Sequence, residues 1–457
     1  MGNRMLLRGG YVITMDPAIG DLPGGDVLVE DDRIVAVQRD ISADADVLDV
    51  TGRIVIPGFV DTHRHTWEAA IRGCAPNDTL DDYFVHILDT FAPVYRAEDV
   101  YAANLAGSLE CLNAGITTLV DWSHINNSPE HPDAAIQALH ETGIRAQYAY
   151  GSANTSLADY WNESKIAVPA ADVRRVRDSY FPSGTSADGL LTMALATRGP
   201  GFCLPEVVRA EWDLARDLDI PVTVHVAMGR VGGRFAMVRQ LASMGLLRPG
   251  TTYIHCCHLS EEEWRLVADS GGLVSIAAQV ELQMGHGWPP VMAALEHGLA
   301  PGLSIDVVTS LPGDMFTQMR AAFGAERARV HEVCWEQDIP CPATMLTARQ
   351  MLEMATINGA AVAGLAGRTG SLTPGKQADI VVVDATSVGV APLIDPVAAV
   401  TLCADVSSVE TVLVAGVSRK RDGRLLANTG RARALAEASR DYLVAAAGRR
   451  PAAVLPA

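Results

Sequence analysis

The sequence contains no CxxC pair, although its 457 residues include eight cysteines. Closely paired cysteines are typical of structural zinc sites and of redox motifs, so neither is expected here. The eight cysteines are scattered along a long chain, and its first residues lack the apolar stretch of a secretion signal. We therefore expect reduced thiols and a cytoplasmic location.

Long apolar runs are also missing, and no segment is long and apolar enough to predict a membrane span. Basic residues are scarce, with 36 Lys and Arg against 54 Asp and Glu and a formal net charge of −18. Such a surface repels a phosphate backbone. We therefore expect no membrane or nucleic-acid partner, and the acidic balance is otherwise explained by solubility.

Both ends of the chain show the period-two alternation of short strands. Residues 5–56 contain five such segments and residues 378–416 contain two more, each bounded by turn-forming residues. Two flanking β segments could close one small sandwich from both ends. An Ala- and Arg-rich stretch from about residue 430 to 446 predicts a C-terminal helix.

Between these ends, apolar β-branched runs alternate with helical patterns. Eight candidate strands end near residues 63, 122, 150, 197, 225, 255, 276 and 306, and helices are expected at 99–113, 132–142, 205–218 and 261–269. Eight β/α repeats predict an α/β fold in which a (β/α)8 TIM-type barrel is inserted into the small β-sandwich. We assign residues 1–57 and 371–425 to the sandwich, 58–370 to the barrel, and 426–457 to a C-terminal helix and tail.

Ionisable residues collect where these strands end, which is where barrels of this type carry catalytic groups. His63 and His65 are two residues apart, so both can face the barrel mouth. His225, His255 and Asp306 end three further strands. Imidazoles with one carboxylate suit Zn²⁺ or Fe²⁺, and such an ion lowers the pKa of water to near neutrality.

Isolated histidines are weaker signals than this set. A lone buried histidine is more often a hydrogen-bonded core residue than a ligand, but five strand-end positions with the same chemistry favour a metal site. His124, His258 and His286 stay open between contact with substrate and ordinary packing.

Several motifs of the chain resemble those of the amidohydrolase superfamily, in its cytosine deaminase and triazine hydrolase (chlorohydrolase-like) branch. The resemblance extends in order from about residue 5 to 425. The motifs occupy residues 57–65 with 72–73, 110–121, 255–259, 314–320, 355–360 and 370–381. The resemblance implies a barrel inserted into a β-sandwich. It implies His63, His65, His225 and Asp306 as ligands, His255 as the group that orients the attacking water, and Asp306 also as the base. Homo-oligomers are common among such enzymes.

Two departures from the family pattern refine this prediction. The fourth strand, around Met193, contains no lysine that could bridge a second ion, so one divalent metal per chain is expected, Zn²⁺ first and Fe²⁺ second. Deaminases of this branch carry a glutamate three residues after the strand-five histidine, whereas this chain has Met228. A thioether donates no proton, so we expect cytosine, guanine and adenine to be poor substrates.

Other residues are candidates for the cavity. Glu281, expected at the end of strand seven, would supply the missing carboxyl group, and Arg198 would hold an anionic substrate group. Trp67, Trp122 and Trp288, together with Met228, would form cavity walls against which a flat substrate ring could pack. Surface exposure, salt bridging and core packing are equal alternatives for these residues.

The sequence thus predicts a metal-dependent amidohydrolase that hydrolyses C–N bonds of a small cyclic or heteroaromatic substrate through metal-activated water, as a deaminase or cyclic amide hydrolase. One alternative is hydrolytic dehalogenation of a triazine-like ring, because chloride leaves without a proton donor. The other is a metal-binding barrel without catalytic activity.

Overall fold

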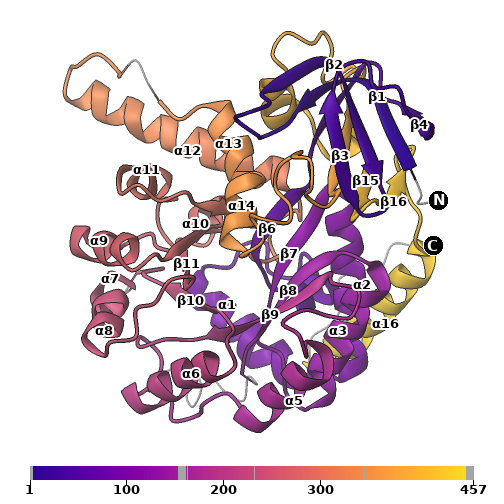
Figure 1. Ribbon diagram of the computed structural model, residues 1–457. Helices are drawn as coiled ribbons and strands as arrows, with labels where there is room; N and C mark the ends of the chain where they lie inside the picture. Colours follow the sequence, from indigo (N-terminus) through magenta and orange to yellow (C-terminus); the bar gives the residue numbers. More distant parts are fainter. Residues whose placement is uncertain (1–3, 153–160, 162, 231, 343–344, 449–457) are drawn as a thin grey trace.

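The computed structural model describes residues 4–152, 161, 163–230, 232–342 and 345–448. Within them the chain forms an eight-stranded parallel sheet, wrapped by helices, and a nine-stranded sheet built from both chain ends (Figure 1). This arrangement confirms the predicted (β/α)8 barrel joined to a small β unit. None of the helices in these residues combines the length and apolarity that a membrane crossing requires.

The parallel sheet contains all eight predicted strands, in the order in which they occur in the chain. They are β6 (Phe59–Arg64), β7 (Ile116–Ser123), β8 (Arg145–Tyr150), β9 (Leu191–Thr197), β10 (Val222–Val226), β11 (Thr252–His255), β12 (Leu273–Ile276) and β13 (Gly302–Leu303). Nearly every residue of these strands is buried. Burial on both faces explains why the strands read as apolar runs rather than as alternating patterns.

The barrel closes between its first strand and the segment that follows its last. β13 is only two residues long, and a parallel bridge beyond it joins Arg64 to Asp306. The His65 N–H donates to the Asp306 carbonyl at 2.7 Å, and the Asp306 N–H donates to the His63 carbonyl at 2.9 Å. The Asp61 carboxylate accepts the Ile305 N–H at 3.0 Å. The closing seam therefore includes three of the predicted metal ligands, His63, His65 and Asp306.

Helices cover the outside of the barrel. The longer ones are α2 (Ala97–Asn113), α3 (Glu130–Thr142), α5 (Ala170–Tyr180), α6 (Pro205–Asp217), α8 (Met237–Ser243), α9 (Glu261–Asp269), α12 (Met315–Glu336) and α13 (Ala348–Ala355). The shorter ones are η1 (Thr66–Ile71), α1 (Leu80–Tyr83), η2 (Phe84–Phe91), η3 (Ala92–Val94), α7 (Gly232–Phe235), α10 (Ala278–Gln283), α11 (Val291–Glu296), α14 (Ile357–Val362), α15 (Pro396–Ala398), η4 (Ala399–Cys403) and η5 (Val406–Ser408).

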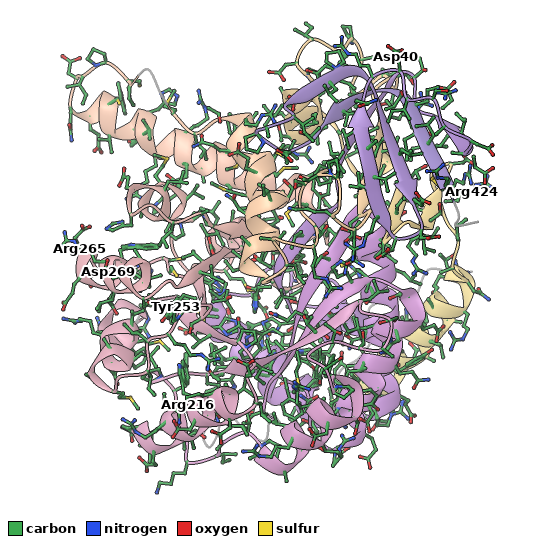
Figure 2. All side chains as sticks on the ribbon, in the orientation of Figure 1. Asp40, Arg216, Tyr253, Arg265, Asp269 and Arg424 are labelled. Atoms are coloured by element: carbon green, nitrogen blue, oxygen red, sulfur yellow. The ribbon has the colours of Figure 1, made fainter. Side chains whose placement is uncertain are left out.

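The four helices predicted in the barrel region are confirmed, each within two residues at either end. Helix α9 shows why its boundary was readable: the Ser260 hydroxyl accepts the Glu263 N–H while the Glu263 carboxylate accepts from Ser260, which forms a capping box. Arg265 and Asp269 of this helix point outward in Figure 2, whereas Tyr253 of β11 is fully buried.

The second sheet joins strands from both termini. Its strands are β1 (Arg4–Ile13), β2 (Asp21–Glu30), β3 (Arg33–Gln38), β4 (Asp46–Asp49), β5 (Arg53–Pro57), β14 (Ile380–Asp384), β15 (Val409–Val414), β16 (Val417–Arg421) and β17 (Arg424–Leu425). The antiparallel pair β5–β14 holds the two ends together. The predicted division at residue 57 falls between β5 and β6, and the C-terminal helix α16 (Thr429–Ala446) packs against α2.

A buried ion pair connects this sheet to the barrel. Arg145, at the start of β8, donates from Nε to Asp379 Oδ2 at 2.7 Å and from Nη2 to Oδ1 at 2.9 Å, and both side chains are 0% exposed. Asp379 Oδ1 also accepts the Ala415 N–H at 2.7 Å, and its carbonyl accepts the Gly58 N–H at 3.0 Å. Asp379 therefore fixes the point where the chain leaves one sheet and enters the other.

Substitution Asp379→Ala is expected to destabilise the fold strongly, because it leaves the Arg145 guanidinium buried without its partner. Loss of one member of a buried pair costs about 3–5 kcal/mol in the free energy of unfolding. Scanning calorimetry would measure this as a lowered Tm. The control is Asp217→Ala, which breaks an exposed pair with Arg174, where the expected change is about 0–1 kcal/mol. Equal Tm shifts in the two variants would contradict the conclusion that the buried Arg145–Asp379 pair stabilises the junction between the two sheets.

Candidate metal centre and its cavity

Four buried side chains converge at the mouth of the barrel. They are His63 from β6, His225 from β10, His255 at the end of β11 and Asp306 beyond β13, and their potential ligand atoms all lie within 4.8 Å of one another. His63 Nε2 lies 3.0 Å from Asp306 Oδ1 and 3.2 Å from His225 Nε2. Three imidazoles and a carboxylate at this spacing fit the donor set of a divalent zinc or iron site.

His65 lies beside this group. Its Nε2 is 3.3 Å from Asp306 Oδ1, and its Nδ1 lies 3.0 Å from the Trp122 carbonyl oxygen, to which it donates. That hydrogen bond fixes the ring so that Nε2 faces Asp306, as the outer hydrogen bond does in metal-ligating histidines. His255 Nε2 lies 3.6 Å from the other carboxylate oxygen, Oδ2. The structure thus brings together all five predicted residues, and the division into ligands and water-orienting histidine stays a prediction.

Burial sets the charge of these groups. Burial lowers the pKa of His63 to about 3, although hydrogen bonding to Asp306 opposes the change, and burial lowers the pKa of His255 to about 4. Burial and the neighbouring histidines also hold the pKa of His225 well below its usual value. Burial raises the pKa of Asp306, but hydrogen bonds from His63 and His65 outweigh it and hold this pKa well below the usual range. Neutral imidazoles and an ionised carboxylate are the forms that bind metal.

Glu281 lies behind the centre rather than in front of it. It was expected at the end of strand seven, whereas the structure places it on helix α10, fully buried. His255 Nδ1 donates to Glu281 Oε1 at 3.1 Å, and the same oxygen accepts the Ala277 N–H at 2.8 Å. Glu281 is not among the residues that line the cavity. These contacts correct its expected orientation: the carboxylate holds His255 in place and does not face a substrate.

The backbone is strained at the same positions. His255 and Asp306 both have φ of 70°, and Ala227 and Cys256 have φ of 52° and 57°. Residues with a β-carbon rarely occupy this left-handed region, and such conformations persist where the surrounding structure enforces them, often at functional sites. The two ligand candidates that end β11 and follow β13 are therefore held in a conformation that the fold imposes.

A two-lobed cavity adjoins the centre. A small lobe of about 30 Å³ lies against the ligand groups, and a larger lobe of about 350 Å³ extends away from them. Both lobes are lined by His225 and Met228. His124 and His286, which the sequence left open, also line the small lobe, whereas His258 lines neither. Met228 is the predicted cavity residue that the structure places in the wall.

The other predicted cavity residues are packed or exposed elsewhere, and their part in substrate binding stays a prediction. Trp122 is buried beneath the centre, its ring centroid 4.5 Å from that of His225, and Trp67 donates from Nε1 to His124 Nδ1 at 3.3 Å. Trp288 is 50% exposed. Arg198 is buried, donates to the Ile166 carbonyl and lies 3.8 Å from Glu211. None of these four residues lines either lobe.

One cavity feature was missed at the sequence level. Tyr83 lines the small lobe and donates its hydroxyl to Glu68 Oε1 at 2.5 Å. Burial raises the pKa of Glu68 to about 8, against the opposing effects of His65 and the Tyr83 hydroxyl. The spacing of Glu68, three residues after His65, was the available signal. His286, a candidate that the sequence left open, is 3% exposed, and neither ring nitrogen has a hydrogen-bond partner among the described residues.

Comparison with known proteins gives one consistent result. The sequence profile of the amidohydrolase family matches residues 54–419. A 5'-deoxyadenosine deaminase of Methanosarcina barkeri is 30% identical over 434 residues, covering 93% of this chain and 94% of the relative. A zinc complex of atrazine chlorohydrolase from Arthrobacter aurescens is 25% identical, with a TM-score of 0.85 and coverage of 95% of this chain and 100% of that one.

An adenosine deaminase from Xanthomonas campestris with bound zinc has the same fold. It is 24% identical, its TM-score is 0.85, and the match covers 96% of this chain and 98% of that one.

We expect one tightly bound divalent metal per chain, because the candidate ligands converge on one point and β9 offers no lysine to bridge a second ion. His63→Ala and Asp306→Ala should each lose the metal. Elemental analysis of zinc-loaded, dialysed protein would measure the stoichiometry. His140→Ala, a partly exposed histidine paired with Asp188, is the matched control and should retain the metal. Two tightly held ions per wild-type chain would overturn this expectation.

Proposed function

Since this chain belongs to the amidohydrolase family, we propose that it is a zinc-dependent deaminase of an aminated heteroaromatic ring. The family match over residues 54–419 and the deaminase relatives confirm the predicted enzyme class, a metal-dependent hydrolase acting on C–N bonds. The observation that carries the proposal is the buried His63, His225, His255 and Asp306 group beside a cavity.

The amine as leaving group is supported by the relatives. A chain 30% identical to this one over most of its length is a 5'-deoxyadenosine deaminase, so the first substrates to consider are aminopurines carrying a substituent. The partners are then a small cyclic molecule and water. We also propose a cytoplasmic protein without a nucleic-acid partner, on the grounds that all eight cysteines are free and the net charge is −18. The proposed homo-oligomer rests on the family resemblance alone.

We assign the chemistry as follows. His63, His65, His225 and Asp306 would hold the ion, whose Lewis acidity would lower the pKa of water so that a nucleophile is available near neutral pH. The Asp306 carboxylate would accept the proton of the attacking water and pass it to the amine, which would leave as ammonia when the C–N bond breaks. His255 orients that water and stabilises the charge that develops on the substrate. Glu281 acts through His255, because its Oε1 accepts the Nδ1–H at 3.1 Å and so fixes the ring orientation.

The ring nitrogen of the substrate needs a proton or a hydrogen bond as water adds, otherwise negative charge builds up on the ring. Met228 lines the cavity and supplies neither. We assign this part to His286, whose buried ring lies 4.6 Å from that of His255, centroid to centroid, with both nitrogens unpartnered among the described residues. A neutral imidazole offers one N–H donor and one acceptor.

A second candidate function follows from the same methionine. Chloride leaves as an anion and needs no proton donor, so a chlorinated triazine-type ring suits an apolar wall at Met228. Because the chain is 25% identical to an atrazine chlorohydrolase, the substrate panel below includes a chlorinated triazine. The two functions differ in the released group, which is ammonia for one and chloride for the other.

His255→Ala should keep its zinc but lower kcat by about 10²–10⁴, the range for a lost acid–base partner. Glu281→Ala should lower activity about 10–100-fold, as expected for loss of a group that orients a functional histidine. Glu281→Gln retains an oxygen acceptor for His255 Nδ1–H, so it should recover most of that loss. Steady-state kinetics with parallel zinc analysis would measure both quantities. Loss of zinc together with turnover in His255→Ala would make His255 a primary ligand instead.

A substrate panel tests the function itself. It contains 5'-deoxyadenosine, 9-methyladenine, the free bases cytosine, guanine and adenine, and a chlorotriazine, with ammonia and chloride assayed separately. We expect ammonia from the substituted aminopurines and a kcat/KM below about 10⁵ M⁻¹s⁻¹ for the free bases. Ammonia release should fall in His286→Ala, because the ring nitrogen loses its donor.

The control for this panel uses a matched pair at one position. Met228→Glu introduces the carboxyl group found in related deaminases and should raise deamination of the free bases about 10–100-fold, a typical gain from a proton donor. Met228→Gln has nearly the same shape without the acid and should not. Chloride release without ammonia from any ring would support the second function, and efficient turnover of the free bases by the wild type would contradict the role given to Met228.

A further inference from the structure

The larger lobe of the cavity is walled by aromatic side chains from separate segments. Phe84, Trp161, Phe202 and Phe235 line it. The Trp161 ring meets Phe84 at 5.1 Å and Phe202 at 5.0 Å between centroids, in both cases edge to face, and Phe202 lies 6.0 Å from Phe235. Phe84 begins a π-helix, η2, a form that occurs often at functional sites.

This aromatic lobe is continuous with the small lobe at the metal centre. Five residues line both lobes: Leu80, Phe84, Trp161, His225 and Met228. The small lobe is the narrower of the two, at about 30 Å³ against about 350 Å³ for the aromatic lobe. A substrate whose reacting edge faces the centre would therefore extend its body into the aromatic lobe, whose volume is within the range of small-molecule sites.

The aromatic lobe has few polar groups. Among its described lining residues, Asp81 and Arg230 are exposed, and His225 belongs to the metal centre. The other side chains are aromatic, aliphatic or thioether groups, including the 3% exposed Met237. A hydroxyl group buried against them would lose its hydrogen bonds to water without replacement.

We propose that the aromatic lobe selects substrates whose ring carries an apolar, preferably aromatic, substituent on the side away from the reacting amine. This inference rests on the proposed function for the reacting ring. A planar substituent would be held by edge and face contacts to Trp161 and Phe202, and flexible Met228 and Met237 fill the remaining space. The enzyme would then favour an aromatic substituent over a ribosyl substituent, whose hydroxyls would lie partly against apolar side chains.

The test compares three aminopurines that differ only at N9: 9-benzyladenine, 9-methyladenine and adenosine. Zinc-loaded wild type should deaminate 9-benzyladenine with a kcat/KM at least 10-fold above the other two. Phe202→Ala should remove most of this preference, so that the ratio of kcat/KM for 9-benzyladenine to kcat/KM for 9-methyladenine falls to below about threefold. Phe323→Ala, at a half-buried phenylalanine of α12 that lines neither lobe, is the matched control and should change no ratio.

Binding of the unreactive products separates the two proposals. Calorimetry of 9-benzylhypoxanthine and 9-methylhypoxanthine should give at least a 10-fold difference in Kd, lost in Phe202→Ala. A difference below threefold, or one that survives Phe202→Ala and Phe235→Ala, overturns the aromatic-lobe assignment even if ammonia is released. If the difference in Kd depends on Phe202 but no aminopurine releases ammonia, the role of the aromatic lobe in binding is supported and the proposed deamination is overturned.

Discussion

Two backbone hydrogen bonds across the barrel seam determine both the fold and the candidate centre. They run from the His65 N–H to the Asp306 carbonyl and from the Asp306 N–H to the His63 carbonyl, at 2.7 and 2.9 Å. The same residues carry the side chains that face one another at the centre. Because the final strand has only two residues, closure depends on this short bridge more than on an extended ladder. The centre and the architecture are therefore one structural unit.

The residues that fix the orientation of the histidines lie on one side of the centre, and the residues that would contact substrate lie on the other. Trp122 accepts from His65 through its carbonyl while its ring packs on His225, and Glu281 accepts from His255. These contacts lie on the protein side of the imidazoles and fix their orientation. On the cavity side lie Met228, His124 and His286. The hydrogen-bond donors among these three residues are therefore the N–H groups of neutral imidazoles, and none is a carboxylic acid. Specificity for the reacting ring is thus expected to depend on imidazole N–H groups.

The sequence was sufficient for the barrel because its strands are buried apolar runs and its helices begin at recognisable caps such as Ser260. It also located all five groups of the centre, since parallel strands deliver their last residues to one rim. It failed for Glu281 because the chain turns into a helix directly after β12, and residue spacing alone does not reveal that turn. The sequence could not place the tryptophans for a different reason: large aromatic side chains fill cores and cavity walls equally well. Trp161, Phe84 and Phe202 come from distant segments, and only the folded chain brings them together.

The left-handed backbone at His255 and Asp306 has a consequence for how such an enzyme can evolve or be engineered. Glycine adopts this conformation without penalty, so the substitutions that would relax the backbone most are those that remove the functional side chains. Conformations of this kind cost roughly 1–3 kcal/mol each. Thermostabilising changes must therefore come from elsewhere in the barrel, because at these positions stability and activity are opposed.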